Sequence, residues 1–315
     1  MPDRFTAQRL YNALQHLLIL AGLGLMLSVP AWLLAGGIGV LWVFGLVLMT
    51  LYLGARIPAR LVLAHSAAGL LHPHQAPRVY RVLEQLYRRA GLPGAPLLFY
   101  VPSRDLNAFA VGDARDGGIA VTEGLLQTLS LRELAGVLAH EVSHLRNGDT
   151  RVMSMAATMT RLTIWGAFLV QLALVLMLPM VVVGEVRMPW LELLMVGLAP
   201  TLSTLLQLAL SRNREFAADL EAASLTRDPL GLATALETLE RRQGLWLTAV
   251  FGRQTPGWFC YLQTHPSTRE RVRRLAMLAD QSPQRPEPRP SHPDEPLVIS
   301  RPASRGHRYW LGRHR

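Results

Sequence analysis

The sequence predicts a mostly helical α+β protein that is anchored in a membrane by four transmembrane helices and carries a small β-sheet outside the bilayer. Half of the 315 residues are hydrophobic, and this share is typical of membrane proteins. The segment from Leu10 to Ala55 contains no Asp, Glu, Lys or Arg. It is too long for one span and suits a hairpin of two helices of about 20 residues each.

The positions of the predicted spans follow from the apolar runs. The first two helices should turn near Pro30 or Gly36–Gly37, where helix-breaking residues interrupt the run. Leu162–Gly184 is a second uncharged run that is long enough to cross a bilayer. Pro189–Leu210 is a weaker candidate because polar residues interrupt it, and a buried amphipathic helix is the alternative.

The arginines next to these runs predict the orientation in the membrane. They flank the outer ends of both helix pairs: Arg4, Arg9, Arg56, Arg60, Arg146, Arg151, Arg161, Arg212 and Arg214. Both termini and both polar segments are therefore predicted to be cytoplasmic. All 32 basic residues are arginine, but no nucleic-acid-binding motif accompanies the charge, so anionic lipid is the simpler partner. The single cysteine, Cys260, is consistent with a reducing compartment.

The polar segment after the hairpin combines helices and strands. Apolar residues at helical spacing from Val79 to Tyr87 predict a helix that stops at the sequence AGLPG. Leu97–Val101 and the stretch from Gly117 onward predict two strands, the second of which enters a helix. The sequence DLNAFAVGDARDGG between them is predicted to be a loop with hairpin-turn residues.

The last third of the chain is predicted to be helical up to a tail. Helices are expected in the stretch SRNREFAADLEAASL, from Pro229 to Arg242, and after THPSTRERVRRLAML. From about Gln281 onward the chain is rich in Pro and Arg and is predicted to be disordered. Two transmembrane helix pairs are expected, at 1–55 and 152–210. A cytoplasmic domain is expected in two parts, at 56–151 and 211–280, followed by the tail at 281–315.

The stretch LAGVLAHEVSHLRNGD places two histidines and a glutamate on a predicted buried helix. Ser130 and Glu133 form a capping box that begins the helix, and apolar residues continue at helical spacing. His140 and His144 are one turn apart, so both imidazoles can reach one metal ion, and Glu141 lies beside them. This is the spacing of zinc peptidases, in which the glutamate takes a proton from water. Ionisable groups on a buried stripe are costly unless they are paired or bind metal, which favours a metal site.

A catalytic zinc site needs a third protein ligand. Glu215, at the start of the helix after the fourth apolar run, is the best candidate, because the small residues that follow it allow close packing against the histidine helix. Asp219, four residues later on the same face, can hold a ligand histidine by its second ring nitrogen or pair with an arginine. The alternative is that both acidic side chains are exposed to solvent.

Five sequence motifs occur in order around the apolar runs: LNAFAVG, GGIAVTEGLL, ELAGVLAHEVSHLRNGD, SRNREFAADLEA and THPSTRERVRRL. This combination, over roughly Leu10 to Asp280, resembles the HtpX-like membrane zinc metalloproteases, relatives of the CAAX prenyl protease. The resemblance implies a gluzincin-type endopeptidase that holds one zinc ion by His140, His144 and Glu215, with Glu141 as base. It also implies a bacterial inner-membrane protease with a cytoplasmic site that degrades misfolded or damaged membrane proteins in the stress response.

Further residues are candidates for binding the substrate or the transition state. His265, in the sequence THP, can donate a hydrogen bond to the carbonyl oxygen or only cap a surface helix. Asn107 can bind the substrate backbone or stabilise its own turn. The family resemblance implies that Arg271 is a structural or substrate-side partner. The strand through Ile119 and Val121 offers an edge to which an extended substrate can add, unless it is an ordinary core strand.

Three other functions explain parts of this pattern. A non-catalytic scaffold would not need Glu141, yet this base and every proposed ligand are present. An antibiotic-sensing receptor protease would need a large outer sensor domain, and a prenyl-protein protease would need more spans to form a lipid chamber. We therefore expect a peptidase whose partners are the lipid bilayer and proteins with unfolded cytoplasmic segments. The sequence makes no prediction of the oligomeric state.

Overall fold

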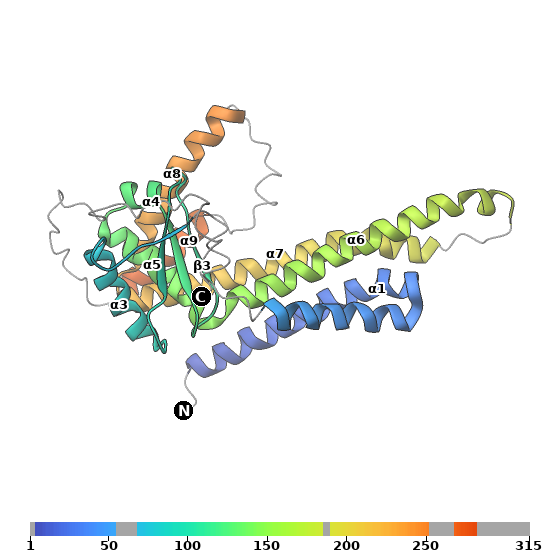
Figure 1. The fold of residues 1–315 in the computed structure, drawn as a ribbon, viewed down its shortest axis with the longest axis horizontal. Coiled ribbons are helices and arrows are strands. Elements are labelled where there is room, and N and C mark those ends of the chain that lie inside the picture. The colour runs from blue at the N-terminus through green and yellow to red at the C-terminus, as the bar shows by residue number, and fades with distance from the viewer. Residues whose placement is uncertain (1–3, 55–67, 185–189, 252–267, 282–315) are drawn as a thin grey trace, which may run out of the picture. The chain divides into compact units, whose positions relative to one another are not determined.

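A computed structural model describes four ranges of the chain: 4–54, 68–184, 190–251 and 268–281 (Figure 1). The chain divides into two compact units, and each consists of two segments: Met1–Arg56 with Arg151–Asn213, and Ile57–Thr150 with Arg214–Arg315. The first unit contains most of the apolar helices, and the second contains the sheet and the histidine motif. The predicted tail beyond Gln281 lies outside the described residues.

The N-terminal helix α1, Arg4–Gly54, folds back on itself (Figure 1). Its backbone leaves the helical conformation at Ala35 and at Gly36, which has φ 59° and ψ −150°. This conformation is accessible essentially only to glycine. The two arms then approach closely, because a methyl group at Gly39 would lie 2.3 Å from the carbonyl oxygen of Ala31. Of the two predicted turning points, the one at Gly36–Gly37 is confirmed, whereas Pro30 lies inside the helix.

Among the described residues, three helices are long and apolar enough to cross a membrane: α1 through Leu17–Met49, α6 at Asp149–Val182 and α7 at Trp190–Thr226. The helix α1 is folded at Gly36 into two arms. That each arm crosses the membrane separately, which would give four spans in total, stays a prediction. The run Pro189–Leu210 falls almost entirely within the continuous helix α7, and most of its large apolar side chains are exposed. This exposure does not support the alternative of a buried amphipathic helix.

A small apolar core joins the helices of the first unit. It consists of Ile19, Leu23, Leu27 and Val47 from α1, Ala156 and Met159 from α6, and Leu210 from α7. Many of the other large apolar side chains of these helices are exposed in the structure. An apolar surface of this extent is typical of helices that contact lipid.

The second unit contains a four-stranded mixed sheet with the strand order β1-β2-β4-β3. Its strands are β1 at Gly69–Leu70, β2 at Leu97–Val101, β3 at Ala108–Val111 and β4 at Gly118–Thr122. β2 and β4 are parallel, whereas β1 and β3 are antiparallel to their neighbours. The two predicted strands are confirmed as β2 and β4. The segment predicted to be only a loop contains β3 as well as a turn.

β4 is an interior strand, so one prediction about it is wrong. Ile119 lies opposite Leu98 of β2 on one side and opposite Ala110 of β3 on the other. Ile119 and Val121 are both 0% exposed. The expectation that this strand offers an edge to a substrate therefore fails, and the core-strand alternative is right. Among the described strands, β3 forms the edge on this side of the sheet.

The turn between β3 and β4 explains why β3 was missed. Gly112 has φ 90°, and a methyl group there would lie 2.2 Å from the carbonyl oxygen of Asp116. The Asp113 carboxylate accepts hydrogen bonds from the backbone N–H groups of Arg115 and Asp116, at 2.8 and 3.1 Å. These turn residues were recognised in the sequence, but they follow a strand of only four residues.

One face of the sheet packs against helices in an apolar core. The further helices of this unit are α3 at Pro77–Ala90, α4 at Glu123–Thr128, α5 at Leu131–Asn147, α8 at Pro229–Phe251 and α9 at Thr268–Gln281. α5 is central to this core, with Leu134, Leu138 and Val142 all 0% exposed. Gly136 allows close approach to α8, because a methyl group there would lie 2.8 Å from Cα of Leu232. Polar side chains on α5 are therefore surrounded by protein.

Candidate metal centre

The ends of α5 are determined by local hydrogen bonds. The Ser130 hydroxyl accepts from the Glu133 N–H, and the Glu133 carboxylate accepts from the Ser130 N–H at 2.9 Å, which confirms the predicted capping box. The helix ends at Gly148, which adopts the left-handed conformation with φ 64°. Between these ends, one helix face carries His140 and His144 toward the same point.

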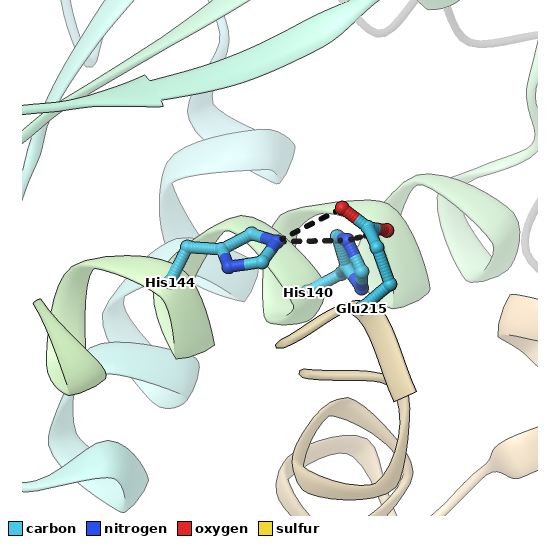
Figure 2. Close-up of side chains that lie close together, drawn as sticks. All are labelled: His140, His144 and Glu215. Atoms are coloured by element: carbon cyan, nitrogen blue, oxygen red, sulfur yellow. Dashed lines mark hydrogen bonds and ion pairs between the residues drawn. The ribbon is translucent and has the colours of Figure 1, made fainter. Parts of the chain in front are cut away.

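The two imidazoles and Glu215 of α7 come together in the interior (Figure 2). The Nε2 atoms of His140 and His144 are 3.1 Å apart. The Glu215 carboxylate places Oε2 3.4 Å from His140 Nε2 and Oε1 3.8 Å from His144 Nε2. Glu215 is 7% exposed and Asp219 is 4% exposed, so the alternative of solvent-exposed acids is wrong.

The three groups lie close enough together to hold one metal ion. In a tetrahedral site, bonds of about 2.0–2.1 Å separate the ligand atoms by about 3.3 Å. The closest separations here are 3.1, 3.4 and 3.8 Å, the last two from different oxygens of Glu215, and one ligand atom of each residue lies within 4.8 Å of the others. Two imidazoles and one carboxylate are a ligand set that catalytic zinc sites use, and they leave a fourth position for water. The residues present therefore suit a catalytic divalent cation.

Asp219 and Arg271 lie directly behind two of these ligands. Asp219 Oδ1 is 3.0 Å from His140 Nδ1. Arg271 of α9 donates from Nε and from its second terminal nitrogen to the two Asp219 oxygens, both at 2.6 Å, and its other terminal nitrogen is 3.2 Å from Glu215 Oε2. All four side chains in these contacts are buried. Arg271 is thus placed as a structural partner of the acidic groups.

Asp149 and Arg214 also belong to the site, and the sequence reasoning did not select them. His144 Nδ1 is 2.7 Å from Asp149 Oδ2, and the other oxygen of Asp149 accepts a hydrogen bond from Arg214. Asp149 is 3% exposed. The sequence feature that could have indicated Asp149 is the pair Gly148 and Asp149, four and five residues after His144. A left-handed glycine at a helix end turns the next residue back toward the helix.

The Glu141 carboxyl is buried next to the histidines. Burial is the largest effect and raises the pKa of this carboxyl, and Glu215 raises it further. The nearby histidines and a backbone hydrogen bond from Ala110 of β3 lower the pKa but do not outweigh burial. A raised pKa allows a carboxyl to accept a proton and to return it near neutral pH. The bond from Ala110 also places the free edge of the sheet beside Glu141.

Electrostatics favour a cation at His140. Burial alone would lower the pKa of this imidazole, but Asp219 and Glu215 outweigh burial and raise its pKa to about 10. The pKa of His144 is instead lowered, first by burial and then by His140. The two carboxylates that favour a proton on His140 would equally favour a metal ion at the adjacent Nε2 atoms.

A second polar cluster links α5 to α7 beside the site. Glu221 Oε2 accepts hydrogen bonds from the Ser143 hydroxyl at 2.7 Å and from the Asn147 amide at 2.6 Å. Arg146 donates to the other Glu221 oxygen. These side chains lie on the same two helices as the histidines and Glu215, but they contribute no atom to the ligand triangle.

The remaining predicted site residues have different placements. His265 lies outside the described residues. Asn107 is exposed directly before β3, and its backbone N–H and C=O are bonded to Thr122, so its side chain is free to serve either predicted role. Ile119 and Val121 are 0% exposed and lie in the apolar core together with residues of α5.

This chain is similar to one peptidase family, to several curated proteins and to a solved structure. The profile of peptidase family M48 matches residues 73–279. A protease HtpX homolog from Acaryochloris marina is 41% identical over 271 residues, covering 81% of this chain and 90% of that protein. Another from Trichormus variabilis is 35% identical over 291 residues, covering 86% and 98%. The crystal structure of S. mikatae Ste24p is 17% identical with a TM-score of 0.49, covering 85% of this chain and 65% of that one.

The family match includes the whole histidine helix, the apolar helices α6 and α7, Glu215 and Arg271, and the two relatives cover 81% and 86% of this chain. Long apolar helices and a buried His-His-Glu triangle are what a peptidase that uses a metal and resides in a membrane requires. The chain therefore belongs to peptidase family M48 and is an HtpX-like membrane metalloprotease.

Proposed function

We propose that this protein is a zinc-dependent endopeptidase that cleaves misfolded or damaged membrane proteins at the cytoplasmic face of a bacterial inner membrane. The observation that carries the proposal is the buried triangle of His140, His144 and Glu215, whose separations suit zinc. The arginines at the outer ends of the apolar helices support the cytoplasmic orientation. Substrates with unfolded cytoplasmic segments suit a protease anchored beside them.

Several side chains of the site have separate roles in the proposed hydrolysis. A zinc ion, when bound, supplies a Lewis acid that activates water and polarises the scissile carbonyl. Glu141 takes the proton from the attacking water and returns it to the leaving amine, a role that its buried carboxyl suits. Asp219 holds His140 by its Nδ1 atom, so that Nε2 faces the metal position. His265 is proposed as the hydrogen-bond donor to the carbonyl oxygen.

The free edge of β3 is the proposed binding surface for the substrate backbone. Asn107 and Thr122 form a hydrogen-bonded pair, and such pairs alternate along an antiparallel ladder. The backbone groups of Ala108 and Ala110 therefore face away from β4, and Ala110 binds Glu141 on that side. An extended peptide that adds to this edge would pass beside the base, and recognition through backbone atoms would tolerate many sequences.

Addition of the substrate as a strand predicts an alternating response to backbone methylation. In a peptide series with single N-methyl groups, kcat/KM should fall about fivefold at every second position near the cleaved bond, because one hydrogen bond contributes about 1 kcal/mol. Positions between them should respond little. Equal sensitivity at consecutive positions, or none at any position, would show that the substrate does not pair with β3.

Metal removal tests the proposed function directly. The protein purified in detergent is expected to contain about one zinc ion per chain and to hydrolyse casein, since the site has one set of three ligands. A strong chelator should abolish hydrolysis, and added zinc should restore it. Metal content is measured by atomic absorption and hydrolysis by release of labelled peptides. Zinc bound at one per chain without cleavage of casein or of an unfolded membrane-protein segment would favour a scaffold function.

A further inference from the structure

We propose that Asp149 and Arg214 form a positioning pair that orients His144 for metal binding. This inference rests on the zinc site proposed above. His144 Nδ1 lies 2.7 Å from Asp149 Oδ2, a short distance that suits an imidazole N–H donating to a carboxylate. The hydrogen therefore resides on Nδ1, which leaves the Nε2 lone pair directed at Glu215 and His140.

The Asp149 carboxylate is itself held in place. Its second oxygen accepts a hydrogen bond from Arg214, and both side chains are largely buried, at 5% and 11% exposed. A buried carboxylate with an arginine on one oxygen and an imidazole on the other has little freedom to rotate. It also lies at the first residue of α6, immediately after the left-handed Gly148 that ends α5. The ligand histidine and its acceptor are thus joined by one tight helix end.

Arg214 precedes the ligand Glu215 in the chain, so adjacent residues of α7 serve both sides of the triangle. Glu215 supplies a ligand atom, and Arg214 supports the aspartate that holds His144. A shift of this turn of α7 would move the third ligand and the support of the second ligand together. The pair therefore links the geometry of the two ligands, which a lone hydrogen bond from solvent would not do.

The arrangement repeats a pattern found at the other histidine. His140 Nδ1 faces Asp219, and Asp219 is held by Arg271. In both cases an aspartate oxygen lies within 3.0 Å of the ring nitrogen that points away from the metal position, and an arginine holds the aspartate. Two such supports, built from different segments of the chain, indicate that His144 is oriented by its own pair and not only by the packing of α5.

The test compares metal binding by the parent protein and by Asp149→Ala in detergent. Affinity for Zn2+ is measured by competition with a chromogenic chelator, and the coordination geometry is followed in the Co2+-substituted protein by visible absorption. Loss of a group that orients a ligand histidine is expected to weaken metal affinity about 10- to 100-fold. The Co2+ absorption bands should also shift, which a change in global stability alone would not produce.

Asp149→Ala leaves Arg214 buried without its carboxylate, which can destabilise the fold. The double variant Asp149→Leu with Arg214→Leu removes both charges and the acceptor of His144 Nδ1, and it is expected to show the same loss of affinity with less loss of thermal stability. Asp228→Ala is the matched control, because Asp228 accepts two hydrogen bonds from Arg132 at the N-terminal end of α5, away from the ligands. This control should lose stability and keep the parent Co2+ spectrum.

Parent-like affinity and an unchanged Co2+ spectrum in folded Asp149→Ala or in the double variant would overturn the inference and leave the zinc protease intact. An equal spectral shift in Asp228→Ala would also overturn it, because the effect would then be one of general stability. A parent protein that binds neither ion would instead remove the proposed zinc site itself, and the inference with it.

Discussion

Replacement of Glu141 by glutamine is expected to reduce kcat by about 10²- to 10⁴-fold, the contribution typical of a general base. The amide has nearly the same shape as the carboxyl but cannot accept the proton of the attacking water. The three ligand atoms come from other side chains, so the variant should still bind zinc like the parent protein. Hydrolysis of a fluorogenic casein and zinc content per chain, measured on the same preparation, check both parts of the prediction.

Glu84→Gln is the control for this substitution. Glu84 lies on α3 with a half-exposed side chain that pairs with Arg88 one turn away, and it has no contact with the ligand triangle. This variant should hydrolyse casein at the parent rate. Parent-like activity in Glu141→Gln would exclude Glu141 as the base, and loss of zinc from Glu141→Gln would mean that the substitution disturbs the site and not the proton transfer.

Replacement of Glu215 by alanine is expected to remove both zinc and activity. Two histidines alone leave the metal without its only negatively charged ligand. Loss of a group that only orients a ligand weakens metal affinity about 10- to 100-fold, so the loss of zinc affinity in Glu215→Ala should be larger than this. Zinc content after dialysis and titration of the apoprotein with zinc measure this loss. Retention of stoichiometric zinc in Glu215→Ala would show that another group is the third ligand.

Glu221→Ala is the matched variant on the same helix. Glu221 lies six residues after Glu215 in α7 and binds Ser143 and Asn147 of α5, the helix that carries both histidines. Its loss should reduce the free energy of unfolding by about 1–3 kcal/mol through lost hydrogen bonds to a charged acceptor. Zinc content should stay at the parent level. Loss of zinc from both variants would indicate that α5 and α7 have separated and not that a ligand is missing.

The edge of the sheet shows where prediction from sequence reached its limit. The strands at Leu97–Val101 and Gly118–Thr122 were recognisable because each is a compact apolar run between turn residues. Which strand lies inside the sheet depends on pairing between β2 and β4, and between β4 and β3, across the sheet. Alternation of side chains along a strand describes its two faces and carries no information about its neighbours. Ile119 and Val121 were therefore assigned to the wrong position.

The pairs behind the ligands illustrate the same limit. Asp219 was recognisable because it lies one helical turn from Glu215, a separation that places both on one face. Asp149 reaches His144 only because Gly148 ends α5 in a left-handed conformation. Arg214 is 65 residues from Asp149, and their contact depends on how α7 packs against the end of α5. No local pattern encodes a contact of this kind.

The sequence by itself determined the features that depend on neighbouring residues: the apolar helices, a turn at Pro30 or at Gly36–Gly37, the capped helix α5 and the spacing of His140 and His144. These follow from helical periodicity, from glycine conformation and from hydrogen bonds over three or four residues. Only the tertiary structure decided that β3 forms the edge beside Glu141 and that Asp149 with Arg214 supports His144. The reason is physical, because these contacts join segments that are distant in the chain and form only when the helices and the sheet pack into one core.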